Sequence, residues 1–155
     1  NTVVFWMLGG LGLAQWQHLI YPAGILLLCL ALLLPKTREL NALAMGDETA
    51  VTLGIPVVRF RLLLFVVTAL LTGVMVAFSG AIGFVGLMVP HFVRLIVGGD
   101  NVRVVPLSAA FGALALIWAD IVARLIMAPE DMPIGVVTGL VGGIAFILIL
   151  RSGRA

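Results

Sequence analysis

Long apolar runs, separated by short polar segments, form most of this chain. A helix crosses the roughly 30 Å hydrocarbon layer of a bilayer with about 20 mostly apolar residues, within a range of about 17–25. Five runs meet or approach this length and predict membrane-spanning helices: residues 20–35, 57–78, 82–97, 104–127 and 133–150. A sixth run, residues 3–14, is too short and glycine-rich to cross, and predicts a short interfacial or re-entrant helix.

Composition supports a lipid-embedded protein. Hydrophobic residues make up 63% of the 155 residues and charged residues only 10%, and the mean hydropathy is +1.26. Soluble domains carry about 25% charged and about 45–50% apolar residues, and a domain of about 150 residues cannot hide so much apolar surface. We therefore predict an all-α fold, a polytopic membrane helix bundle in which residues 1–155 form a single transmembrane domain.

Basic residues mark one side of this bundle. Eight of the nine Lys and Arg residues fall in segments that the five spans place on the same side: Lys36, Arg38, Arg59, Arg61, Arg94, Arg103, Arg151 and Arg154. Only Arg124 falls on the other side. Cytoplasmic loops carry the excess of Lys and Arg, so we expect the C-terminus to be cytoplasmic. The basic residues form no patch suited to nucleic acid.

The one long polar insertion, residues 36–61, predicts two short helices hinged at Gly46. Asp47 stands where a helix N-cap is wanted, and Gly54 followed by Pro56 predicts a helix end. Apolar residues recur in both helices: Leu40, Leu43 and Ala44 in the first, and Ala50, Val51 and Leu53 in the second. A solvated loop needs no such stripe, so we expect it to dock on another protein.

No constellation for catalysis or metal binding is visible in the sequence. Lys36, the only lysine, does not lie in a phosphate-binding loop of the G-x-x-x-x-G-K-[ST] type. We therefore expect this chain to bind no cofactor and any energy input to come from a partner.

Two features of the later spans have more than one interpretation. Asp120 and Arg124 are one helical turn apart, which allows an intrahelical ion pair; the pair either is purely structural or also offers positive charge to an acidic partner outside. Gly135, Gly139 and Gly143 recur at four-residue intervals, with Thr138 and Gly142 beside them. Such small residues let another backbone approach closely, and they either pack helices or form the wall of a pathway.

Residues 80–94 read GAIGFVGLMVPHFVR. This run resembles the signature of the permeases in the iron-chelate and cobalamin branch of ATP-binding-cassette importers. Further matches follow in the same order along the family: residues 5–10 (FWMLGG), 40–50 (LNALAMGDETA) with 53–54 (LG), 119–124 (ADIVAR) and 133–138 (PIGVVT). Family members are about twice as long and have ten spans, so the resemblance implies that this chain is their C-terminal half.

The resemblance also implies functional residues. The coupling element that sits in a cleft of the ATPase subunit would comprise Leu43, Gly46, Asp47, Glu48, Ala50, Leu53 and Gly54. Arg124 matches an outward arginine that pairs with an acidic residue of the solute-binding protein. The translocation path would include Gly135, Thr138, Gly139 and Gly142. Ile144 stands where the family usually has a proline, so the last helix should be straighter here.

The resemblance implies import of a metal chelate, foremost a ferric siderophore, with haem or cobalamin as alternatives. ATP and Mg²⁺ would bind two copies of a separate ATPase subunit. A periplasmic or lipid-anchored solute-binding protein and a second permease subunit, in a homo- or heterodimer, would complete the assembly in a bacterial inner membrane. Two other hypotheses are an ion-gradient-driven secondary transporter, for which Asp120 is the candidate carboxylate, and a membrane scaffold that transports nothing.

Overall fold

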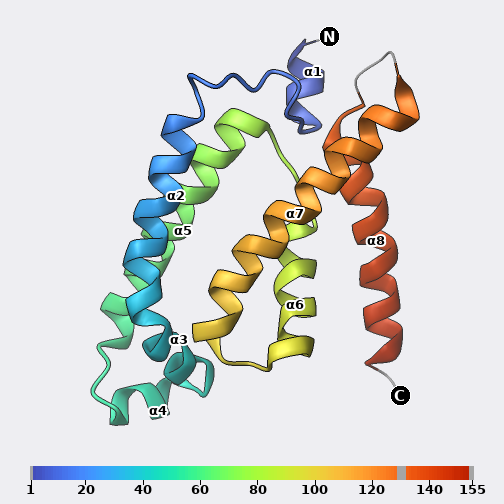
Figure 1. Cartoon of the computed structure of the whole chain (residues 1–155). Coiled ribbons are helices and arrows are strands. Elements are labelled where there is room, and N and C mark those ends of the chain that lie inside the picture. The colour runs from blue at the N-terminus through green and yellow to red at the C-terminus, as the bar shows by residue number, and fades with distance from the viewer. Residues whose placement is uncertain (1, 129–131, 154–155) are drawn as a thin grey trace.

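The computed structural model describes residues 2–128 and 132–153, and within these ranges it contains helices and no strand (Figure 1). The elements are α1 (Thr2–Met7), α2 (Ile20–Leu33), the 3₁₀ turn η1 (Leu34–Lys36), α3 (Thr37–Ala44), α4 (Asp47–Thr52), α5 (Val57–Ser79), α6 (Val85–Val97), α7 (Asn101–Met127) and α8 (Ile134–Ser152). The predicted all-α class is confirmed. Residues 129–131 and Arg154 lie outside the described residues.

Within the described residues, four helical stretches are long and apolar enough to cross a membrane. They are Ile20–Ala44, in which α2 passes through η1 into α3, then Val57–Ser79, Asn101–Ile126 and Ile134–Ser152. Four of the five predicted spans therefore contain a helix long enough to cross the membrane. The helix of the third, α6, has 13 residues, which at 1.5 Å per residue cover only about 20 Å.

The predicted boundaries of two spans were wrong. The third was expected to begin at residue 82, but residues 80–84 are not helical, and Phe84 has the left-handed backbone conformation with φ 65°. The fourth was expected to begin at Val104, but α7 begins at Asn101. The Asp100 carboxylate accepts a hydrogen bond from the Val102 amide at 3.0 Å and so caps the helix three residues earlier.

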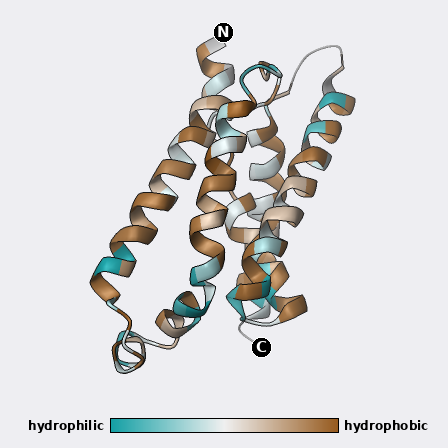
Figure 2. Ribbon diagram, turned by 60° about the vertical axis from the view of Figure 1, so that its left-hand side comes forward, coloured by the Kyte–Doolittle hydropathy of each residue, from teal (hydrophilic) through white to brown (hydrophobic). Residues whose placement is uncertain are grey.

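The helices are arranged as a pair beside a group of three. The antiparallel helices α2 and α5 pack on each other, and α7 packs on α6 and α8. One end of the molecule carries α3, α4, the connection between α6 and α7 and the last turn of α8, while α1 lies at the opposite end (Figure 1). Figure 2 shows hydrophobic residues along the long helices and hydrophilic residues gathered toward their ends.

Little of the apolar surface is buried. The accessible surface is 10684 Å², whereas a compact soluble monomer of 16.4 kDa would expose about 7,500 Å². Cys29 is among the few fully buried side chains, and its Sγ lies 3.8 Å from the Val67 carbonyl oxygen between α2 and α5. Exposed leucine, isoleucine, valine and phenylalanine side chains cover the long helices, as expected of helices that face lipid or further protein segments.

Candidate coupling and docking sites

The α3–α4 hairpin has the hinge that the sequence predicts. Gly46 adopts φ 118° and ψ 153° between the two helices, a backbone conformation that is strained for residues with a Cβ. Asp47 was predicted to be the N-cap of α4, and this prediction was wrong. Gly46 occupies that position, and the Asp47 carboxylate instead accepts a hydrogen bond from Arg61 Nη2 of α5 at 2.8 Å.

The hairpin has an apolar interior of its own. Ala50 is fully buried and packs with Ala42 and Val57, and the half-buried Leu43 and Ile55 close the cluster. Part of the predicted apolar stripe therefore holds α3, α4 and the start of α5 together. Ala50, predicted as a coupling residue, would act through this packing, because its side chain is not accessible to another protein.

The exposed residues of the hairpin form the candidate coupling surface. Met45, Val51 and Leu53 expose 66%, 60% and 62% of their surface. The other predicted coupling residues on this surface are also exposed: Gly46, Asp47, Glu48 and Gly54. Met45 was not singled out from the sequence, although its position directly before the hinge glycine was a usable signal.

An open cleft of about 480 Å³ lies beside the coupling surface. It is lined by Lys36, Arg38, Glu39, Ala42, Leu53, Gly54, Ile55 and Pro56. The cleft combines basic and acidic side chains with the exposed Leu53, so it suits a protein segment that carries both apolar and charged residues.

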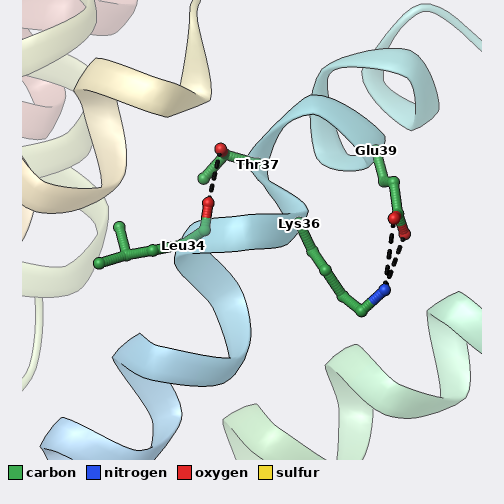
Figure 3. A network of polar contacts seen from close by, with 4 residues as sticks. All are labelled: Leu34, Lys36, Thr37 and Glu39. Carbon is green, nitrogen blue, oxygen red and sulfur yellow. Dashed lines mark hydrogen bonds and ion pairs between the residues drawn. The ribbon is translucent and has the colours of Figure 1, made fainter.

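The hairpin is held at the end of α2 by a short set of local contacts (Figure 3). The buried Thr37 hydroxyl donates to the Leu34 carbonyl oxygen at 2.9 Å, and Lys36 Nζ lies 3.3 Å from the Glu39 carboxylate. The same ammonium group lies 5.8 Å from the centre of the Phe60 ring in α5. These contacts fix the turn η1, so α3 continues α2 rather than hanging from a loose loop.

A second set of polar contacts joins α3 to α7 and was missed from the sequence. Asn41 Nδ2 donates to Asp100 Oδ1 at 2.7 Å, and the Asn101 amide donates to Asn41 Oδ1 at 2.8 Å. The hydrogen bond from Asn41, followed by that from the Val102 amide and the nearby arginines Arg103 and Arg38, holds the pKa of Asp100 below its ordinary value.

The opposite end of α7 carries the predicted ion pair. Arg124 Nε lies 2.9 Å from Asp120 Oδ2, which confirms the expected intrahelical pair. The Arg124 side chain remains about half exposed, at 53%, and borders a small depression. That depression is lined by Gly10, Leu11, Gly12, Met132 and Ile134 together with the pair itself.

Three of the four predicted path residues pack against other parts of the chain. Gly135 donates its amide to the Gly9 carbonyl oxygen at 3.3 Å, and a Cβ there would overlap the Leu8 carbonyl oxygen. Gly142 lies against the Phe84 side chain, and Thr138 is buried. These contacts pack α8 against the segments that follow α1 and precede α6. Gly139 has open space beside it, and the role of all four as path residues stays a prediction.

An apolar cavity of about 230 Å³ separates α8 from α6 and α7. Its lining includes Met88 of α6, Trp118 of α7, and Val137, Thr138 and Val141 of α8. Among the described residues, no group of three or more His, Cys, Asp or Glu side chains is placed to hold a metal ion.

The comparisons with known proteins agree with this architecture, a polytopic helical membrane protein with a two-helix hairpin at one end. The model of the FecCD transport family matches residues 1–152. The chain belongs to this family, and it is a multi-pass membrane protein.

Curated relatives match almost the whole chain. The hemin transport system permease protein of Yersinia pestis is 44% identical over 148 residues, 95% of this chain and 44% of that protein. The Fe(3+)-citrate import system permease protein of Bacillus subtilis is 40% identical over 154 residues, 99% of this chain and 46% of that protein. The chain thus spans about half the length of the curated relatives that it matches, in agreement with the expected C-terminal half.

A solved structure has the same fold. It is described as an inward-facing conformation of a metal-chelate type ABC transporter, and its TM-score is 0.91 at 31% sequence identity. The match covers 97% of this chain and 49% of that chain.

Proposed function

We propose that this chain supplies the C-terminal half of a permease that imports a metal chelate, foremost a ferric siderophore, at the expense of ATP. ATP and Mg²⁺ bind a separate ATPase subunit, present in two copies. A solute-binding protein delivers the chelate outside, and a second permease subunit completes the path. The complex lies in a bacterial inner membrane with the C-terminus of this chain in the cytoplasm.

The observation that carries the proposal is the α3–α4 hairpin. Its apolar interior and its contacts with η1, α5 and α7 make it a firm projection, while Met45, Val51 and Leu53 remain exposed on it. A firm projection with an exposed apolar surface suits a protein on which an ATPase subunit docks and to which it transmits a conformational change. Membership of the FecCD transport family and the relatives named for hemin and Fe(3+)-citrate support the same function.

The main alternative, an ion-gradient-driven transporter, needs an ionisable carboxylate in the membrane. Asp120 is its candidate, but its carboxylate oxygen lies 2.9 Å from Arg124 Nε, so the carboxylate already has a charged partner on its own helix. A scaffold that transports nothing is the other alternative, and the experiment below distinguishes all three.

The experiment is uptake of an iron-55 siderophore into proteoliposomes that contain the full-length permease, its ATPase and its solute-binding protein. We expect uptake only with ATP. Leu53→Glu should reduce uptake at least about tenfold while ATP hydrolysis continues, because a charge on the coupling surface opposes apolar docking. Ser152→Glu is the matched control, since it adds the same charge to an exposed position at the same end of the molecule.

Uptake driven by a pH or sodium gradient without ATP would support the secondary transporter. Absence of uptake across ferric siderophores, haem and cobalamin would support the scaffold. Normal, ATP-coupled uptake by Leu53→Glu would overturn the assignment of the coupling surface.

A further inference from the structure

Asn41 makes the most specific contact between the hairpin and the long helices. Its amide donates to Asp100 Oδ1 at 2.7 Å and accepts from the Asn101 amide at 2.8 Å. Both polar atoms of the side chain are therefore used, and both partners belong to the first turn of one helix, α7. Such paired hydrogen bonds fix orientation as well as distance.

Asp100 accepts hydrogen bonds both from Asn41 and from the backbone of α7. The carboxylate oxygen that accepts from Asn41 also accepts from the Val102 amide at 3.0 Å and caps the helix. Val104, one turn further on, is buried, and α3 packs on α7 around these contacts. A displacement of α3 would therefore move the first turn of α7 with it.

The helix that begins at this contact carries Asp120 and Arg124 at its other end. From Asp100 to Arg124 the rise is about 36 Å at 1.5 Å per residue. The helix is continuous from Asn101 to Met127, and Pro106 lies only in its second turn. One continuous element thus connects the coupling surface with the outward end of the molecule.

The other polar link from the hairpin, the Asp47–Arg61 ion pair, is less suited to transmit a movement of the hairpin. Asp47 and Arg61 are both about half exposed, at 55% and 48%, and exposed ion pairs of this kind contribute little. The pair also leads to α5, which ends at Ser79, away from the helix that bears Arg124.

We propose that Asn41 is a positioning residue that transmits movement between the α3–α4 hairpin and α7, and so links the ATPase side to the Asp120–Arg124 pair. The inference rests on the proposed function, because it takes the hairpin as the place where the ATPase acts. The same helix would also carry the effect in the other direction, so a binding protein that docks near Arg124 changes ATP hydrolysis.

The test is an exchange of the two side chains in the reconstituted full complex. Asn41→Asp alone places a second carboxylate against Asp100 and removes the donor. The double variant Asn41→Asp with Asp100→Asn again places a donor opposite an acceptor. With the side chain at position 100 turned so that its amide nitrogen faces position 41, the new carboxylate accepts from that nitrogen and from the Asn101 amide, and the oxygen at position 100 faces the Val102 amide. Ser152→Asp is the control for the added charge.

The quantity measured is the ratio of ATP hydrolysis with and without the chelate-loaded binding protein. We expect Asn41→Asp to lower this ratio by about fivefold or more, at the lower end of typical coupling between sites, and the double variant and the control to retain it. A merely structural role would lower ATP hydrolysis with and without the binding protein alike and leave the ratio unchanged. An unchanged ratio in Asn41→Asp, or no rescue in an assembled double variant, would overturn the inference.

Hydrogen exchange separates the two ways of failing. Exchange of the Asn101 and Val102 amides should increase in Asn41→Asp and return to the wild-type rate in the double variant, whatever the protein transports. If hydrogen exchange increases in Asn41→Asp and recovers in the double variant, but the wild-type complex transports no chelate with ATP, the proposed function fails. If the wild type transports the chelate and the double variant recovers neither the hydrolysis ratio nor the hydrogen-exchange rates, only the role of Asn41 fails.

Discussion

Gly135 sits where three backbone segments meet, at the start of α8. Its amide donates to the Gly9 carbonyl oxygen at 3.3 Å, and a Cβ would overlap the Leu8 carbonyl oxygen and approach that of Ala81. The role of a small residue here is thus to let backbone approach backbone, and its replacement forces the α1 segment away from α8.

We therefore expect Gly135→Ala to destabilise the protein by about 1–3 kcal/mol, the usual effect of overpacking. Gly73→Ala is the matched control, because Gly73 lies inside α5 with open space beside it. That variant should be neutral or more stable by about 0.5–1 kcal/mol, since alanine favours the helix. Thermal unfolding of the purified full-length protein in detergent measures both, and equal melting temperatures would contradict the assigned contact.

The Asp100 carboxylate should make the contact between α3 and α7 sensitive to acid. Its pKa is lowered from the ordinary value of 3.8, so the folded state favours the charged form. The stabilisation is fully present at pH values above the ordinary one and is lost as the pH falls through the lowered pKa.

Melting temperatures of the wild type and of Asp100→Asn, measured from neutral to acidic pH, check this expectation. The wild type should be the more stable at neutral pH, and the difference should shrink toward zero in acid. A difference that stays constant with pH would show that the charge of Asp100 contributes nothing.

Single residues also show where prediction from the sequence ends. Asp47 was expected to cap α4, but Gly46 takes that position and the carboxylate meets Arg61, 14 residues away. Asn41 lies 59 residues from Asp100, and no local pattern indicates a contact over that separation. The Asp120–Arg124 pair could be predicted because both partners lie on one helix, where spacing alone brings them together.

At the scale of elements, apolar runs predicted the helices better than their ends. The runs of α5, α7 and α8 are long enough for the requirement of a bilayer to identify them, and that of α2 approaches this length. The start of α6 could not be predicted, because residues 82–84 are as apolar as the helix that follows. Phe84 adopts φ 65° and rests its side chain on Gly142, so a contact with α8 fixes that boundary.

The hairpin shows the same division between pattern and packing. Helical spacing and the hinge glycine predicted two short helices, and both are present. The pattern could not say which apolar residues face inward, because both faces of so short a helix find apolar neighbours. The burial of Ala50 and the exposure of Leu53 follow from the way in which α4 folds back on α3 and α5.

At the scale of the whole molecule, the distribution of basic residues predicts the orientation. Leu53 and Ser152 belong to the end that carries most arginines, and Trp16, 90% exposed, belongs to the other. In a Cys29→Ala background, we expect a membrane-impermeant maleimide to label Trp16→Cys in intact cells, and Leu53→Cys and Ser152→Cys only after permeabilisation. Labelling of Leu53→Cys in intact cells would show that the predicted orientation is reversed, and it would overturn the proposed function.

The passage of α2 into α3 through η1 has a mechanical consequence. Ile20–Ala44 is a nearly continuous helical run, and the bonds around Thr37 brace its single irregular turn. Such a run can tilt as one unit, with α2 as its long arm and α3 as its short arm. Because α2 is 14 residues long, about 21 Å, a tilt of only about 5° imposed on the short arm would swing the far end of the long arm by about 2 Å, comparable with the helix shifts that accompany allosteric transitions.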